Sequence, residues 1–410
     1  MTRTNRVVPL LFVFAVSAFL ATLTLSVEGQ STPEALVGFD NLTNELVSQF
    51  EFDRVLAIFE EREGVDEGLG PVYNAQSCAE CHQNPVTGGI SQITELRAGH
   101  LDGFGNFVDA AGGSLINDRA IDAQIQERVA GAETIRTLRA STNVLGAGYV
   151  EAINSNTLIA IANAQPGQSG GVIAGQVIQV PVAEAPGQVR VGRFGWKNQH
   201  ASLLSFSGDA YLNEMGITSR LNRTENTSVG RSVADFDDVA DPEDPALKDA
   251  DIDNFTVFMR ATKAPPRDTA LAATVAATAG SDLFDKIGCN ICHVRNITTS
   301  APGTVINGGA FTVPGPLGNK IIHPFSDFLL HNIGTGDGIV QNGGQSTANK
   351  LRTMPLWGTR TRDRHMHDGL SLTFTDSILR HAGEARDVTS RFRALSGTQQ
   401  SQIITFLQSL

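Results

Sequence analysis

Two five-residue stretches decide how this chain can fold: Cys78-Ala79-Glu80-Cys81-His82 and Cys289-Asn290-Ile291-Cys292-His293. Each has two cysteines separated by two residues and followed at once by a histidine. In this arrangement both thiols can add to the vinyl groups along one porphyrin edge, and the adjoining imidazole can ligate the iron. The two motifs therefore predict two covalently bound c-type haems, with His82 and His293 as axial iron ligands.

The cysteine count favours haem over the other uses of paired cysteines. The chain has four cysteines, and all four belong to the two motifs. A thioredoxin-like redox pair is the alternative for a single motif, and a zinc site would need further cysteines to complete its four ligands. The sequence leaves no cysteine for a structural disulfide.

The first thirty residues resemble an export signal. Arg3 and Arg6 precede an uncharged, almost wholly apolar run over residues 7–27, and Val27-Glu28-Gly29 places small residues at a cleavage site. We therefore expect a signal peptide over residues 1–29 and a periplasmic or otherwise secreted protein. The alternative is an uncleaved membrane anchor, because the apolar run exceeds the roughly 7–15 residues that are usual for a signal peptide.

Composition limits the partners of the exported part. The net charge of −12 argues against nucleic acid, which requires clustered lysine and arginine to displace counterions from phosphates. An acidic surface is compatible with a basic redox partner. We expect either a small electron donor, such as a cytochrome or a cupredoxin-like protein, or a small-molecule substrate, and a membrane contact only if the signal segment stays uncleaved.

Apolar spacing predicts a mainly helical fold. A helical stretch lies within residues 31–70, a short helix carries Leu283, Phe284 and Ile287 and ends at Gly288, and a terminal helix is capped by Ser396 or Thr398. Alternating valines over residues 172–191 indicate a short β element. The predicted fold class is therefore two cytochrome-c-like haem domains, residues 30–270 and 271–410, with a small β-containing insertion in the N-terminal half.

The second axial position of each iron decides between catalysis and simple electron transfer. A second protein ligand makes an electron-transfer centre, whereas an open position admits peroxide or oxygen. Five methionines and seven further histidines are the candidates. The histidines are His100, His200, His323, His331, His365, His367 and His381.

Beyond the two motifs, the chain resembles the bacterial di-haem oxidoreductase family of peroxidases and thiol oxidoreductases, which is related to di-haem cytochrome c peroxidase and to MauG. The resemblance spans nearly the whole mature chain. The stretches that carry it are Gly68-Leu69-Gly70-Pro71 through His82, Gly192-Arg193-Phe194-Gly195-Trp196-Lys197 through Asn213-Glu214-Met215-Gly216, Gly288 through His293, and Pro355-Leu356-Trp357-Gly358 through His367-Asp368-Gly369 to His381-Ala382-Gly383-Glu384.

The resemblance implies a role for several residues. Trp196 lies where the peroxidases keep a tryptophan between the two haems, and Glu214 matches their distal carboxylate, which shuttles a proton between the peroxide oxygens. His381 falls where those relatives place the second ligand of the C-terminal haem, which would make that haem bis-histidine. His367 is expected to be structural, with Met366 as the fallback ligand. Relatives also hold a calcium ion between their domains through backbone oxygens, so calcium is a further candidate cofactor.

Two positions depart from the peroxidase pattern. Leu204 or Phe206 stands where the peroxidases carry a distal glutamine. Ala98 stands where they carry a histidine that caps the N-terminal haem, and His100 lies two residues further on. We therefore expect an open or weakly capped N-terminal haem.

The resemblance implies a peroxidase-like enzyme, similar to cytochrome c peroxidase. It would reduce peroxide at the N-terminal haem with electrons relayed from the C-terminal haem. The alternatives are a di-haem electron-transfer cytochrome without catalysis and a MauG-like oxidase of another substrate.

Overall fold

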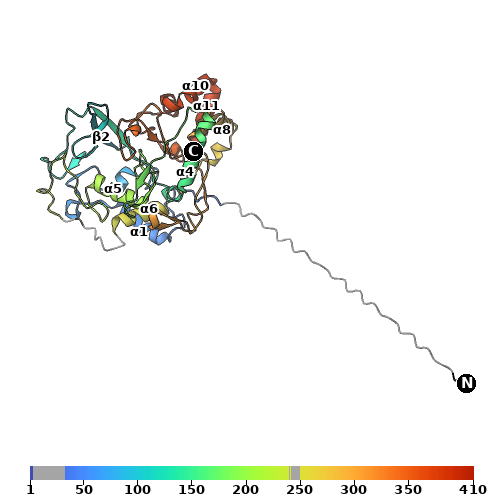
Figure 1. The fold of residues 1–410 in the computed structure, drawn as a ribbon, viewed down its shortest axis with the longest axis horizontal. Coiled ribbons are helices and arrows are strands. Elements are labelled where there is room, and N and C mark those ends of the chain that lie inside the picture. The colour runs from blue at the N-terminus through green and yellow to red at the C-terminus, as the bar shows by residue number, and fades with distance from the viewer. Residues whose placement is uncertain (3–32, 240, 242–249) are drawn as a thin grey trace. The chain divides into compact units, whose positions relative to one another are not determined.

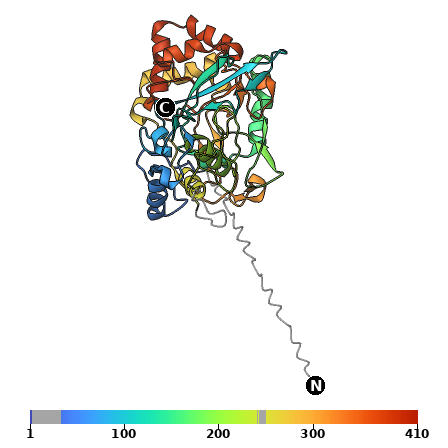
Figure 2. The same cartoon turned by 90° about the vertical axis from the view of Figure 1, so that its left-hand side faces the viewer.

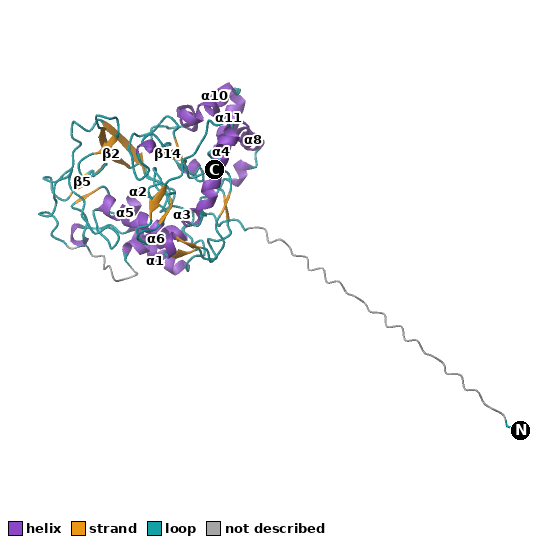
Figure 3. Ribbon diagram, viewed as in Figure 1, coloured by secondary structure: helices purple, strands orange, loops and turns teal. Residues whose placement is uncertain are grey.

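The computed structural model describes residues 1–2, 33–239, 241 and 250–410, so nearly all of the predicted signal peptide lies outside the described residues. Residues 33–410 form one unit in which short helices alternate with small sheets (Figure 1, Figure 3). Among the described residues, no helix has both the length and the apolar character needed to cross a bilayer. The predicted domain boundary after residue 270 remains a prediction.

Helices α1 (Gln49–Glu60), α5 (Leu203–Met215) and α6 (Asp251–Ala261) surround the first motif, which forms the short helix α2 (Cys78–Cys81). The predicted helix within residues 31–70 is therefore confirmed as α1. Its Phe59 ring lies 4.4 Å from the ring of Phe258 in α6 and 6.2 Å from that of His82. Ser77 begins α2 by accepting a hydrogen bond from the Glu80 amide, which is a normal N-cap. The buried face of α1 therefore packs behind the His82 ring through Phe59.

The largest sheet is built from residues that follow the first motif and precede Trp196 along the chain. Strand β2 (Thr94–Leu101) pairs antiparallel with β3 (Phe107–Asp109), β4 (Leu115–Ile116) and β6 (Ile135–Ala140). Ala98, at the position of the peroxidases' capping histidine, is wholly buried in β2. The predicted β element is confirmed as the hairpin of β7 (Gln179–Pro181) and β8 (Val189–Val191).

The C-terminal helices pack around the second motif. Helix α8 (Val275–Ile287) ends at Gly288, whose φ of +96° lies in the left-handed region that glycine adopts readily. Helix α11 (Gly397–Gln408) begins with a capping box between Ser396 and Gln399, which confirms Ser396 as the cap. The C-terminal helices lie together in both views (Figure 1, Figure 2).

The remaining helices range from 4 to 15 residues, and the remaining strands have 2 residues each. Two-residue strand pairs also occur in the C-terminal half, where no β structure was predicted. The helices are α3 (Ala147–Glu151), α4 (Ser155–Ser169), α7 (Thr269–Ala272), α9 (Phe374–Arg380) and α10 (Arg386–Ala394), and the strand pairs are β1 (Val72–Tyr73) with β5 (Arg119–Ala120), β9 (Ile297–Thr298) with β12 (Ile321–Ile322), β10 (Val305–Ile306) with β11 (Phe311–Thr312), and β13 (Leu330–His331) with β14 (Leu351–Arg352).

Candidate haem-binding sites

Two cavities lie next to the two cysteine–histidine motifs. The N-terminal cavity, of about 160 Å³, is lined by Cys78, Cys81 and His82 of the first motif. The C-terminal cavity, of about 190 Å³, is lined by Cys289, Cys292 and His293. Most of the other side chains around the C-terminal cavity are apolar, as a porphyrin face requires, whereas apolar and polar side chains are about equally frequent around the N-terminal cavity. The structure therefore gives each motif a hollow in which a planar, largely apolar group can be held.

Three predicted iron ligands share one hydrogen-bond arrangement. In each, the imidazole Nδ1 bonds to a backbone carbonyl, which fixes the tautomer with its lone pair on Nε2. Burial lowers the pKa of all three, and the nearby His381 adds to burial in lowering that of His293 to about 4. All three rings are therefore neutral, as metal ligation requires. The pairs are His82 with Gly89 (3.2 Å), His293 with Phe325 (3.0 Å) and His381 with Ser377 (2.7 Å).

His381 follows directly on α9 and lines the C-terminal cavity together with His293. His365, Met366 and His367 line the same cavity. His331 lines it too, but its two ring nitrogens are bonded to Asp327 and Glu384, each at 2.8 Å. These contacts make His331 a structural residue, and they leave His381 as the predicted second ligand and Met366 as the fallback.

His100 is not among the described residues that line the N-terminal cavity. Its Nδ1 bonds to Glu133 at 2.8 Å. Phe206, one of the two candidates for the missing glutamine position, does line this cavity, whereas Leu204 does not. Two side-chain amides also line this cavity, those of Gln199 and Asn74. The open or weakly capped N-terminal haem therefore remains a prediction.

Glu214, near the end of α5, reaches the N-terminal cavity beside a carboxylate that the sequence reading missed, Glu95 of β2. Asn74 Nδ2 donates to Glu214 Oε2 at 2.8 Å. Burial and the neighbouring Glu95 raise the pKa of Glu214 to about 8. Burial alone would raise the pKa of Glu95 as well, but Arg97 holds it below its usual value. Glu95 went unnoticed because no local motif links a strand residue to a helix more than a hundred residues away.

Two arginines that line the C-terminal cavity have buried guanidinium nitrogens without a partner in the described part of the chain, although Arg352 Nη1 donates to the Arg193 carbonyl. Arg352 Nε and Arg362 Nε and Nη2 have no hydrogen-bond partner among the described residues, and both side chains line the cavity. Burial lowers the pKa of Arg352 to about 9 and that of Arg362 to about 10. An unpaired buried cation is costly unless an anion meets it. The two propionates of a porphyrin would supply such anions, so the C-terminal cavity fits a haem.

Trp196 lines both cavities. Its Nε1 donates to the Ala140 carbonyl at 2.8 Å, and its own carbonyl accepts from the Arg352 amide at 2.8 Å. The His367 ring packs edge-on against it at 6.0 Å. The indole is therefore held from both halves of the chain.

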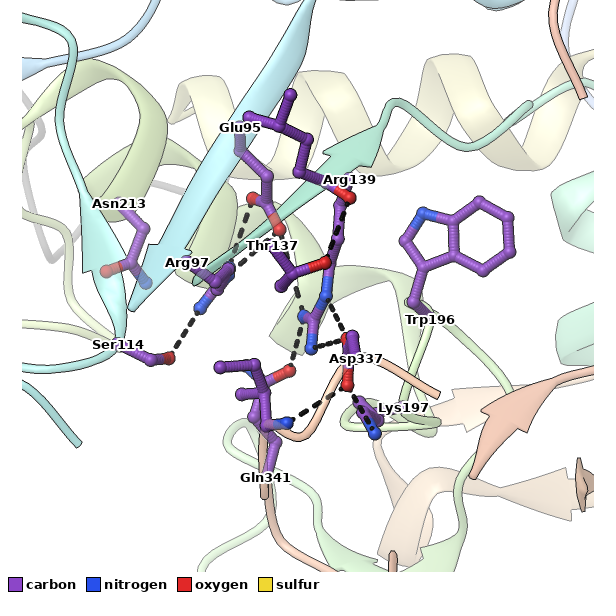
Figure 4. A network of polar contacts seen from close by, with 12 residues as sticks. Glu95, Arg97, Ser114, Thr137, Arg139, Trp196, Lys197, Asn213, Asp337 and Gln341 are labelled. Atoms are coloured by element: carbon purple, nitrogen blue, oxygen red, sulfur yellow. Dashed lines mark hydrogen bonds and ion pairs between the residues drawn. The ribbon is translucent and has the colours of Figure 1, made fainter. Parts of the chain in front are cut away.

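A buried network of charges stands beside Trp196 (Figure 4). Asp337 accepts from Arg139 Nε at 2.8 Å and lies 2.8 Å from Lys197 Nζ, and all three side chains are buried. Lys197 also donates to three backbone carbonyls of residues 347–350. Because the buried charges are paired and hydrogen-bonded, they lock the loop at Asp337 onto β6 and onto the Trp196 segment.

The chain thus has two cavities, each lined by a cysteine–histidine motif, and Trp196 lies in the wall of both. Residues 116–410 match the family described as "Di-haem oxidoreductase, putative peroxidase". The chain belongs to this family of di-haem oxidoreductases. The matched segment holds Trp196, Glu214, the second motif and His381, whereas the first motif precedes it.

Two solved structures resemble the chain at low identity. Hydrazine synthase of Kuenenia stuttgartiensis, pressurised with xenon, is 14% identical with a TM-score of 0.39, and the match covers 99% of this chain and 100% of that one. A MauG-like protein associated with microbial copper homeostasis is 15% identical with a TM-score of 0.41, and 92% of each chain is covered. A comparison with curated proteins gave no significant match.

Proposed function

We propose that the protein is an extracytoplasmic di-haem c oxidoreductase that reduces hydrogen peroxide in the N-terminal cavity. Cys78 and Cys81 would hold one haem covalently, with His82 as its ligand, and the second motif would hold the other, with His293 and His381 as ligands. When bound, each haem supplies an iron that takes up or releases one electron, and an iron with a free axial position can bind peroxide. Reduction of one peroxide to two waters takes two electrons and two protons.

The position of Trp196 carries this proposal. The indole ring lines both cavities, and hydrogen bonds and an edge-on ring contact hold it in place. Electrons arriving from a donor at the C-terminal cavity would pass through this ring to the N-terminal cavity. The N-terminal cavity presents an acid, Glu214, and no histidine other than His82 among the described lining residues. That arrangement favours peroxide chemistry on this side.

The donor is proposed to be a small redox protein of the cytochrome or cupredoxin type. The net charge of −12 favours a donor with a basic face, and such attraction speeds encounter. The periplasmic location follows from the predicted signal peptide and from the attachment motifs. A calcium ion between the two halves also remains part of the proposal.

The test is a comparison of the chain's two tryptophans. Trp196→Phe should lower steady-state peroxide reduction by about tenfold or more, a barrier increase of roughly 1.4 kcal/mol or more. The first reaction of peroxide with the N-terminal haem should persist, because only resupply of electrons is slowed. Haem content and circular dichroism report on folding.

Trp357→Phe is the matched control. Trp357 is equally buried, but it lines neither of the two haem cavities. Its variant should keep wild-type turnover. Equal turnover in wild type and Trp196→Phe would exclude the relay. A wild-type protein that never reacts with peroxide would instead indicate an electron-transfer cytochrome.

A further inference from the structure

We propose that Glu95 is a second acid–base residue of the peroxide site, and that it forms with Glu214 a hydrogen-bonded pair holding one proton. This inference rests on the proposed function of the N-terminal cavity. Glu95 comes from β2 and Glu214 from α5, and both side chains line the cavity. Each carboxyl group shifts the pKa of the other, as side chains within hydrogen-bonding reach do.

A hydrogen bond between two carboxyl groups requires a proton on one of them, since two carboxylates offer only acceptors. Two such groups at close range do not both ionise at neutral pH, so the pair titrates as a unit. The cavity therefore contains one acid and one carboxylate side by side. The neighbouring side chains decide which is which.

Arg97 selects Glu95 as the carboxylate. Its guanidinium grips both Glu95 oxygens, with Nε–Oε1 at 2.8 Å and Nη2–Oε2 at 3.1 Å, the bidentate geometry that favours an ionised acid. Arg139 adds positive charge 3.8 Å from Glu95 Oε1. Among the described residues, the Glu214 side chain accepts a hydrogen bond from the neutral amide of Asn74. Arg97 also lowers the pKa of Glu214, but by less than burial and Glu95 raise it. The proton therefore belongs to Glu214.

The other charged groups around the pair are already partnered. Asp209 of α5 lines the same cavity and bonds to His200 at 3.0 Å. Asp337, on the far side of Arg139, is bound by that arginine and by Lys197. The charge balance next to the pair is thus set by Arg97.

This assignment divides the proton transfer between two residues. Breaking the O–O bond requires a base to take a proton from the near oxygen and an acid to give one to the far oxygen. A protonated Glu214 can give but cannot take. Glu95 would accept the near proton while Glu214 donates its own, the O–O bond breaks, and the far oxygen leaves as water. A proton then returns from Glu95 to Glu214, and the pair is restored.

The electrons for this reduction come from the external donor through the haems, and the two protons consumed overall come from solvent. The pair itself neither gains nor loses protons over the cycle. Phe206, at one of the two positions matched to the peroxidases' glutamine, cannot hydrogen-bond through its side chain, whereas Glu95 of β2 brings a carboxylate to the same cavity.

The first test is the pH profile of the rate constant for peroxide reacting with the diferric protein. In the wild type the rate should fall above pH about 8, because the raised pKa of Glu214 is the point at which the donated proton is lost. Glu95→Gln should slow the reaction about a hundredfold at neutral pH. Glu214 must then serve as the base, and its pKa is lower in this variant because the neighbouring negative charge is gone. The rate of Glu95→Gln should therefore rise with pH, and should do so at a lower pH than that at which the wild-type rate falls.

Two further variants distinguish the loss of an acid–base group from a general disturbance of the fold. Glu95→Asp keeps a carboxylate and should restore the falling profile with part of the rate. Glu133→Gln is the control, because Glu133 is a buried carboxylate just before β6 that bonds to His100 and does not line the cavity. That variant should behave as the wild type.

The second test does not depend on turnover. The infrared C=O band of a protonated carboxyl, taken as the difference between wild type and Glu214→Gln, should disappear as pH rises through about 8. In Glu95→Gln it should disappear at lower pH, because the neighbouring negative charge is gone.

The two proposals fail in different ways. If the wild type reacts with peroxide but Glu95→Gln keeps its rate, its pH profile and its infrared titration, Glu95 is structural and the inference is wrong. If the wild type is inert to peroxide, the proposed function is wrong and the acid–base role falls with it.

Discussion

Arg362 is a single side chain whose buried guanidinium lacks partners at Nε and Nη2. If it holds a haem propionate, Arg362→Gln removes a positive charge that disfavours the ferric state. The midpoint potential of the C-terminal haem should then fall by roughly 60 mV, which is about 1.4 kcal/mol for one electron. Spectroelectrochemical titration measures this potential.

The control for this prediction lies two residues away. Arg360 donates to the Pro266 carbonyl at 2.6 Å and stacks on Phe39, and it does not line the cavity. Arg360→Gln should leave the potential unchanged. Equal potentials in wild type and Arg362→Gln would show that Arg362 does not hold the propionate.

Single residues also show what sequence reasoning can reach. The motif residues were predictable because haem attachment needs a fixed local spacing. Trp196, Glu214 and His381 were reached through a family resemblance, and the structure brings each to a cavity wall, although their roles remain predictions. Glu95 and Arg97 had no such signal, since their position depends on how β2 packs against α5.

The crossing of α8 and α11 depends on Gly280. A Cβ at this position would lie 1.9 Å from the Gln402 carbonyl oxygen, so the helices can approach only because glycine has none. Gly280→Ala should therefore destabilise the protein by about 1–3 kcal/mol through overpacking. Urea unfolding of the haem-loaded protein measures the change.

Gly167 in α4 supplies the matched substitution. A Cβ there would meet nothing within 4 Å. Gly167→Ala should stabilise the protein by up to about 1 kcal/mol, because alanine has the higher helix propensity. If both variants shift stability in the same direction, the close approach at Gly280 does not control the crossing.

Elements differed in how far they could be predicted. Helices α1, α8 and α11 and the β7–β8 hairpin followed from local apolar spacing, caps and turn residues. The sheet around β2 did not, because its partners come from chain segments up to 46 residues away, as in the pairing of Thr94 with Ala140. The small C-terminal strands were not predicted either, because two-residue pairings leave no periodic signal in the sequence.

At the scale of the whole molecule, the two cavities differ in what faces them. The C-terminal cavity is lined by His381, by the motif that contains His293, and by two arginines with guanidinium nitrogens that lack a partner among the described residues. The N-terminal cavity contains Glu214, Glu95 and Arg97. Trp196 lies beside the Arg139–Asp337–Lys197 network (Figure 4), in which Asp337 of the C-terminal half pairs with Arg139 and Lys197 of the N-terminal half. We therefore expect the two haems to be inequivalent.

Electron paramagnetic resonance of the fully loaded diferric protein tests this inequivalence most directly. We expect one high-spin ferric signal from the N-terminal haem and one low-spin signal from the bis-histidine haem, and His381→Ala should abolish the low-spin signal alone. Two low-spin signals in the wild type, with no high-spin iron appearing after partial reduction, would contradict the account.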